Sequence, residues 1–217
     1  MGTGNILSDR NAVVIVAHPD DETLWCGGTI LTHSLFNWFV ISLSRGDDPE
    51  RAPKFYRCLK ILNATGVMDT LDDGPEQTPL AIEVIKKGIL DLLPELNFDL
   101  IITHNPTGEY TRHLRHEEVS RAVLELWYEK KISTKELWTF AYEDGKKEYF
   151  PRAEEKAYQF PLPEKIWKQK YALITETYGF PPGGFEAKTT PKIEAYWKFK
   201  NPGKAYDWLQ QGGRLKQ

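Results

Sequence analysis

An apolar run that ends abruptly in charged residues limits what this chain can fold into more than any other feature. Five small or β-branched apolar residues occupy positions 13–17, and the next five positions read His18-Pro19-Asp20-Asp21-Glu22. A short continuous apolar run is typical of a strand buried in a parallel sheet. Ligands of open α/β sheets bind beyond the carboxyl ends of such strands. The sequence therefore predicts that one imidazole and three carboxyl groups gather where an α/β enzyme carries its chemistry.

This cluster favours a divalent cation, because three neighbouring carboxylates would otherwise repel one another. His18 and Asp21 are three positions apart across a turn that Pro19 helps to fix, so both side chains can face one point. Neutral imidazole and carboxylate are ordinary zinc ligands. The alternative is that an aspartate simply caps a helix that begins near Thr23. That alternative leaves His18 unexplained.

Strand and helix signals alternate through the first two thirds of the chain. We expect strands at 12–17, 38–43, 67–71, 98–103 and 137–142, and helices at 23–34, 53–64, 80–93 and 117–130. Such alternation predicts an α/β fold, a parallel sheet with helices on both faces. The last third is rich in Pro, Tyr and Trp, with helical patterns at 165–178 and 185–199. We interpret 1–217 as a single domain, with a core at about 10–145 and an aromatic-rich C-terminal extension at about 146–217.

Composition narrows the classes of partner. The net charge of −3 over 217 residues argues against a nucleic-acid-binding protein. No run of eighteen apolar residues exists, so no integral membrane segment is expected. The two cysteines, Cys26 and Cys58, are expected to be reduced thiols in the cytoplasm. Nothing in the composition decides whether the chain forms a homo-oligomer.

A second group of candidate ligands follows the strand at 98–103. Three of the five histidines, His104, His113 and His116, lie within thirteen residues. His113 and His116 are three apart, so at a helix start both point the same way. One of them is expected to complete a His-Asp-His metal site, with His104 as the substitute ligand. The alternative is a solvated basic helix start, since Arg112 and Arg115 flank these histidines.

Two motifs resemble those of a known family. Residues 17–22 read Ala-His-Pro-Asp-Asp-Glu and residues 113–116 have the pattern His-x-x-His, as in the GlcNAc-PI deacetylase family, also called PIG-L or LmbE-like. The resemblance covers roughly the first 145 residues. It implies a Rossmann-like, zinc-dependent hydrolase. Such an enzyme removes an acyl group from a small N-acylated amino sugar, such as an N-acetylglucosamine derivative.

The resemblance also implies a role for each motif residue. His18, Asp21 and His116 would bind one Zn²⁺ or another divalent ion. Asp20 would act as the general base, taking a proton from water and passing it to the departing amine. His113 would face the oxyanion of the tetrahedral intermediate.

Three further residues are expected to bind substrate. Arg51 stands where similar proteins carry a substrate-binding arginine, and Tyr110 belongs to a stretch more weakly similar to a family loop. Arg115 is a departure, because the family commonly has Asp between the two histidines. Its cation would favour a neutral His113 or contact an anionic group of the substrate.

Other functions remain open at this point. A non-catalytic sugar- or metal-binding protein on the same fold would keep the ligands, but it would not need a base such as Asp20 beside them. Two histidines and a carboxylate also describe the facial triad of non-haem iron oxygenases. Those enzymes are built on β-barrels, whereas this chain alternates strand and helix.

Overall fold

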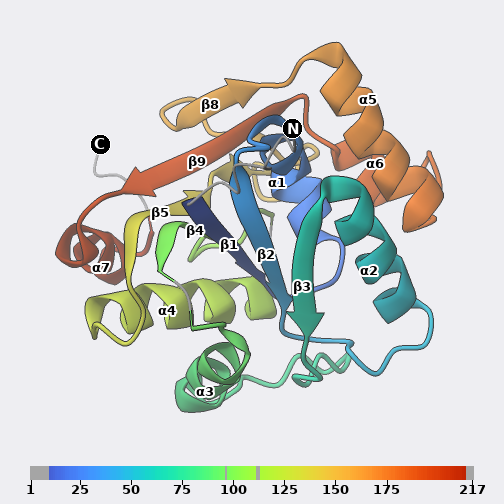
Figure 1. The fold of residues 1–217 in the computed structure, drawn as a ribbon. Helices are drawn as coiled ribbons and strands as arrows, with labels where there is room; N and C mark the ends of the chain where they lie inside the picture. The colour runs from blue at the N-terminus through green and yellow to red at the C-terminus, as the bar shows by residue number, and fades with distance from the viewer. Residues whose placement is uncertain (1–9, 96, 111–112, 214–217) are drawn as a thin grey trace, which may run out of the picture.

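A computed structural model describes residues 10–95, 97–110 and 113–213, and its centre is a seven-stranded sheet (Figure 1). The strand order is β3-β2-β1-β4-β5-β9-β8. The strands span Arg10–Val16 (β1), Phe36–Ser42 (β2), Ala64–Met68 (β3), Phe98–Thr103 (β4), Thr134–Phe140 (β5), Tyr158–Pro161 (β8) and Ile193–Phe199 (β9). A separate two-stranded ribbon joins Tyr142–Glu143 (β6) to Arg152–Ala153 (β7).

Helices cover both faces of the sheet. They span Asp21–Thr32 (α1), Arg51–Leu62 (α2), Ile82–Leu92 (α3), Leu114–Tyr128 (α4), Glu164–Ala172 (α5), Phe185–Thr189 (α6) and Pro202–Gln210 (α7), with a π-helical turn at Leu173–Thr177 (η1). Successive side chains of a strand point to opposite faces. Val13 and Ile15 accordingly pack with residues of α3, α4 and α7, whereas Val14 and Val16 pack with residues of α1, α2 and η1. The expected α/β class with helices on both faces is confirmed.

The two central strands place the polar motifs side by side. β1 and β4 run parallel, and Ile15 is in register with Thr103 near their carboxyl ends. The segment that contains His18 therefore leaves the sheet beside the segment that contains His104. This neighbourhood is what the parallel pairing of two buried strands predicts.

The C-terminal third differs from the sequence-based expectation. The helix expected at 185–199 is wrong beyond Thr189, because Ile193–Phe199 forms β9, antiparallel to both β5 and β8. Pro191 follows Thr190, and a residue before proline is disfavoured in the α region. The sheet is therefore parallel from β3 to β5 and antiparallel at the β9–β8 edge.

A buried carboxylate joins this added edge to α1. Glu194 on β9 accepts hydrogen bonds from the N–H groups of Gly28 and Thr29, each at 2.7 Å, and from Lys170 Nζ at 2.6 Å. A Cβ atom at Gly28 would lie 2.4 Å from Leu162 and 2.9 Å from the Glu194 carboxylate. Glycine in α1 thus allows the C-terminal extension to pack against the helix that follows the first motif. Among the described residues, no helix is both long and apolar enough to cross a membrane.

Candidate metal and catalytic site

Three potential ligand atoms meet just beyond the carboxyl end of β1. The Nδ1 atom of His18 lies 3.1 Å from Asp21 Oδ2 and 3.1 Å from His116 Nε2. The distance between His116 Nε2 and Asp21 Oδ2 is 3.3 Å. Asp21 and His116 are buried, and 12% of the His18 side chain is exposed. The structure therefore brings together the three side chains that were expected to bind metal.

A carboxylate behind each imidazole fixes the direction of its ligand nitrogen. The far nitrogen of His18, Nε2, lies 3.1 Å from Asp73 Oδ1. The far nitrogen of His116, Nδ1, lies 2.5 Å from Glu109 Oε2. A histidine that donates its outer N–H to a carboxylate presents the lone pair of its other nitrogen, as metal-binding histidines do. Both lone pairs here point toward Asp21.

These donors fit a tetrahedral metal ion. Bonds of about 2.0–2.1 Å to zinc place neighbouring ligand atoms roughly 3.3 Å apart, close to the observed separations. Asp21 is itself held in place, since the indole N–H of Trp25 donates to its Oδ1 atom at 3.1 Å. Burial alone would raise the pKa of Asp21, but the imidazoles of His116 and His104 outweigh burial and lower it well below its usual range. The carboxylate is therefore ionised, as a ligand must be.

Two overlapping sets of candidate ligands share His116: one adds His18 and His113, the other Asp21 and His104. His104 is the weaker candidate, because its Nε2 atom accepts the backbone N–H of Ala17 at 3.0 Å. Its Nδ1 atom faces Glu109 at 3.0 Å. Both nitrogens are thus occupied. His104 ties β1 to β4 and holds Glu109 behind His116.

The backbone of Asp20 is strained. Its φ angle is 121°, a region that residues with side chains rarely adopt. Such outliers cluster at functional sites, where the surrounding structure holds them in place. The Oδ2 atom of Asp20 accepts a hydrogen bond from Arg51 at 2.8 Å, and the Arg51 guanidinium lies 4.7 Å from the centre of the Phe180 ring. Burial and the neighbouring Asp21 charge raise the pKa of Asp20 well above its usual value, although Arg51 opposes them.

His113 lies against the ligand cluster. Its ring stacks on His116 with centroids 4.2 Å apart and an angle of 19° between the planes. Its buried Nδ1 atom has no hydrogen-bond partner among the described residues. Burial and the charges of His116 and His18 lower the pKa of His113 to about 3. The ring is therefore neutral and carries one N–H that a ligand can accept.

Arg115 points away from the ligand cluster, contrary to the expectation that it contacts substrate. Only 1% of its side chain is exposed. Its Nε and Nη2 atoms donate to the carbonyl oxygens of Asp72 and Thr78 at 2.6 and 2.8 Å, and its Nη1 atom pairs with Glu118. The guanidinium thus holds the 72–78 loop, which carries Asp73 to His18. This use of Arg115 needs long-range contacts that no local pattern reveals.

The other two residues expected to bind substrate border the site. Arg51 pairs with Asp20, and 32% of its side chain is exposed. Tyr110 is half-buried, with its ring 5.7 Å from that of His116 and 5.1 Å from that of Phe185 on α6. Both side chains can therefore contact a molecule bound at the ligand cluster.

The C-terminal extension reaches the site through a hydroxyl group. Tyr178 is buried and donates to Glu22 Oε1 at 2.7 Å. The other Glu22 oxygen accepts the backbone N–H of Asp20 at 3.0 Å. Tyr178 follows directly on the π-helical turn η1, and π-helical turns often occur at functional sites. The strained backbone at Asp20 is thereby anchored to the last third of the chain.

The sequence did not predict roles for Asp73 or Glu109, and it did not predict the contact between Tyr178 and Glu22. The loops with Asp73 and Glu109 are weakly similar to family loops, and that similarity was a usable signal. Tyr178 is 156 positions from its partner Glu22, and no spacing rule connects them.

The sequence of the chain matches one known protein family. The model of the family described as PIG-L, GlcNAc-PI de-N-acetylase, matches residues 13–127. This chain belongs to the PIG-L family. An uncharacterized protein of Acanthamoeba polyphaga mimivirus is 22% identical, over 79% of this chain and 80% of its own length.

Solved structures with the same fold differ in function. The zinc-inhibited form of teicoplanin deacetylase has a TM-score of 0.65 and 13% identity, covering 88% of this chain and 99% of its own. The 4-carboxy-2-hydroxymuconate hydratase of Pseudomonas putida KT2440 has a TM-score of 0.59 and 16% identity, covering 87% of this chain and 95% of its own. Such likeness shows a shared fold. The reaction has to be argued from the site.

Proposed function

We propose that the protein is a zinc-dependent N-deacetylase that acts on a small N-acylated amino sugar, such as an N-acetylglucosamine derivative. The observation that carries the proposal is the triangle of His18 Nδ1, Asp21 Oδ2 and His116 Nε2, with sides of 3.1, 3.1 and 3.3 Å. Membership of the PIG-L family supports the same reaction class. Three protein ligands leave further positions on the ion open, as in catalytic rather than structural zinc sites.

When bound, zinc lowers the pKa of a water molecule and polarises the amide carbonyl. Asp20 accepts the proton of the attacking water and later delivers it to the departing amine. Arg51 holds one oxygen of Asp20 at 2.8 Å, so the other oxygen can face the water. The Tyr178–Glu22 contact and the hydrogen bond from the Asp20 N–H to Glu22 hold the strained Asp20 backbone in this position.

His113 stabilises the negative charge that develops on the carbonyl oxygen. Its Nδ1 atom has no acceptor among the described residues, so an N–H at that atom can donate to the oxyanion. Tyr110 and Arg51 border the site and contact the sugar. A non-catalytic binding protein would need the metal ligands but neither Asp20 nor this donor.

The test measures acetate released from N-acetylglucosamine, together with zinc content per chain. We expect release to stop after chelation and to return with one equivalent of Zn²⁺. His116→Ala should lose both zinc and activity. His33→Ala, a histidine outside the site, is the matched control and should keep both. Activity that persists without metal, or zinc retained by His116→Ala, would contradict the proposal.

A further inference from the structure

The two histidine ligands of the proposed zinc site are held by carboxylates in very different surroundings. Glu109, behind His116, is fully buried. Asp73, behind His18, lies in the 71–80 segment, which forms neither helix nor strand. A carboxylate on such a segment can direct an imidazole only if the segment itself is held in place. The orientation of His18 therefore depends on what holds this loop.

Arg115 joins the two ends of the loop that carries Asp73. Its Nε atom donates to the carbonyl oxygen of Asp72 at 2.6 Å, and its Nη2 atom donates to that of Thr78 at 2.8 Å. Asp73 lies between these two anchor points, so one planar guanidinium fixes the backbone on both sides of it. Only 1% of the Arg115 side chain is exposed, and the surrounding packing holds the guanidinium in place.

Glu118 adds a third contact between α4 and the same loop. It pairs with the Nη1 atom of Arg115, and its Oε1 atom accepts the backbone N–H of Leu80 at 2.9 Å. His116 is on the same helix. One helix thus positions both histidine ligands, His116 directly and His18 through the loop.

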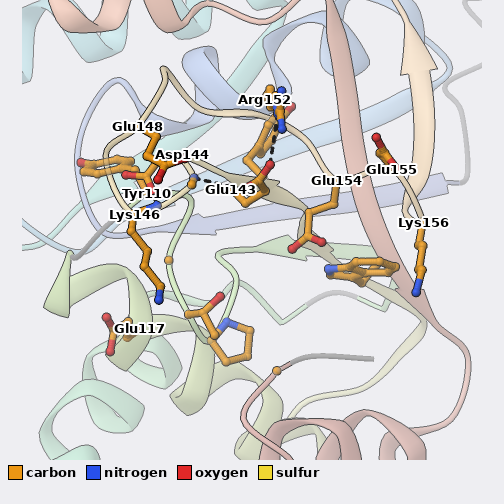
Figure 2. A pocket seen from close by; sticks show the side chains of 17 residues that line it. Tyr110, Glu117, Glu143, Asp144, Lys146, Glu148, Arg152, Glu154, Glu155 and Lys156 are labelled. Carbon is orange, nitrogen blue, oxygen red and sulfur yellow. Dashed lines mark hydrogen bonds and ion pairs between the residues drawn. The ribbon is translucent and has the colours of Figure 1, made fainter. Parts of the chain in front are cut away.

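The side chains at the start of α4 face different parts of the molecule. Glu117 lines a cavity of about 1080 Å³ that opens beside Tyr110 (Figure 2). Neither Arg115 nor Glu118 is among the described residues that line this cavity. Substitution of Arg115 therefore acts on the site through the loop and not through a contact with a molecule in the cavity.

Two other residues contact Asp73, but neither fixes the loop from outside as firmly. Arg45 donates to its Oδ2 atom at 2.9 Å, and 43% of the Arg45 side chain is exposed. Gln77 donates to its Oδ1 atom at 3.0 Å from within the same loop. Arg115, by contrast, is buried and belongs to a helix that packs against the sheet.

We propose that Arg115 is a positioning residue of the metal site, which sets the zinc affinity by holding Asp73 against His18. The Asp73 Oδ1 atom lies 3.1 Å from His18 Nε2, and this contact directs the opposite nitrogen, Nδ1, toward Asp21. Where the family commonly has an aspartate between its two histidines, this chain has a cation that supports the other histidine ligand. The proposal rests on the proposed function through its zinc site.

The zinc dissociation constant of each variant, obtained by competition with a chromogenic chelator, tests the proposal. Arg115→Met should raise this constant about 10- to 100-fold, as loss of an outer partner of a metal ligand does. Asp73→Asn keeps the shape of the side chain without its charge and should raise the constant by a similar factor. Arg121→Met is the matched control, since Arg121 is on α4 and 59% of its side chain is exposed. It should change the constant by less than about twofold.

The double variant Arg115→Met/Asp73→Asn distinguishes positioning from a general effect on the fold. If Arg115 acts through Asp73, the double variant should bind zinc about as weakly as either single variant. A loss equal to the product of the two single losses would overturn the proposal, because Arg115 would then act by another route. Unchanged zinc affinity in Arg115→Met would overturn it as well.

Arg115→Lys keeps a cation beside Glu118 and is the variant to use if Arg115→Met does not fold. A single ammonium group cannot reproduce the geometry in which the guanidinium reaches both carbonyl oxygens. The zinc dissociation constant should therefore still rise about tenfold. Wild-type affinity in Arg115→Lys would mean that only the charge is needed, which contradicts the positioning role.

Exchange of the His18 ring proton separates this proposal from the proposed function. In the metal-free protein labelled with ¹⁵N-histidine, the Nε2–H proton that donates to Asp73 should exchange slowly with water, and Asp73→Asn identifies its signal. Arg115→Met should speed this exchange about two- to tenfold, the scale of one hydrogen bond, whereas Arg121→Met should not. The measurement needs neither zinc nor substrate, so it tests the role of Arg115 even if no acetate is ever released. Exchange that is too fast to detect in the wild type, or unchanged in Arg115→Met, refutes that role whatever the deacetylase assay shows.

Discussion

The first two thirds of the chain and the last third contribute to the site in different ways. The parallel strands β1 and β4 are followed by segments that carry the candidate metal ligands, among them His18 and His116. The last third contributes no candidate metal ligand among the described residues. It contributes contacts instead: Tyr178 on Glu22, Phe180 on Arg51, and Glu194 on α1.

The candidate site residues thus lie in the first two thirds of the chain, whereas the last third provides contacts that stabilise them. Groups at strand ends can be exchanged with little effect on the fold, because the strands themselves are held by buried apolar residues. Two of these contacts, those of Tyr178 and Glu194, are buried and polar, so breaking them leaves unpaired groups in the core. Substitutions in the first region should therefore change rate, and those in the second should change stability.

The largest effect is expected from Asp20→Asn. The amide cannot accept a proton from water, so kcat should fall about 10²- to 10⁴-fold, the range for a general base. Zinc content and the free energy of unfolding should stay within error of the wild type. Steady-state acetate release and metal analysis check this. Loss of zinc in Asp20→Asn but not in Asp21→Asn would show that the two aspartates have exchanged roles.

A large loss of stability is expected from Lys170→Met. Lys170 is fully buried and lies 2.6 Å from Glu194, whose carboxyl group would lose this partner. Breaking a buried pair on one side costs about 3–5 kcal/mol of unfolding free energy. Urea unfolding measures it, with Lys168→Met as the control.

Lys168 is on the same helix, and its pair with Glu164 is exposed. Its substitution should cost less than about 1 kcal/mol. Similar losses of unfolding free energy for the two lysine variants would contradict the idea that buried contacts of the last third stabilise the fold. In Lys170→Met that remains folded, kcat should stay near the wild-type value.

The sequence predicted the reacting region better than the supporting one. The run before His18 and the buried strand before His104 are local patterns, and parallel pairing then brings their ends together. By contrast, the segment that forms β9 was expected to be helical. Its strand conformation depends on pairing with β5, which lies more than fifty residues earlier in the chain. Residues whose role is set by short spacing could be found, and those set by long-range pairing could not.

Arg115 illustrates the same limit. Its place between His113 and His116 suggested a contact with substrate or with His113. The structure buries it against backbone carbonyls some forty positions earlier in the chain. Nothing in a sequence distinguishes an arginine that binds a ligand from one that holds a loop.

A smaller effect, opposite in sign, is expected from Asp20→Gly. Glycine adopts a φ of 121° without strain. The free energy of unfolding should rise by about 1–3 kcal/mol while activity is lost. Urea unfolding of the chelated protein excludes any contribution from metal binding.

Asn63→Gly is the control for that gain. Asn63 has a φ of 53° at the end of α2, a conformation that asparagine tolerates, so its substitution should add less than 1 kcal/mol. If Asp20→Gly raises the free energy of unfolding no more than Asn63→Gly does, the backbone conformation of Asp20 does not destabilise the fold. The stability of the first region would then be unrelated to its chemistry.

The smallest effect is expected where the two regions meet, in Tyr178→Phe. Glu22 loses the hydroxyl donor at 2.7 Å but keeps Thr23 Oγ1 and the Asp20 N–H. Unfolding free energy should fall by about 1–1.5 kcal/mol. Because Glu22 orients the Asp20 backbone, kcat should also fall roughly three- to fivefold with KM unchanged.

Tyr158→Phe, at an exposed tyrosine, is the control for this prediction and should alter neither the unfolding free energy nor kcat. A loss of stability with an unaltered kcat would show that the last third only stabilises the fold. A loss of kcat would show that it also positions the base.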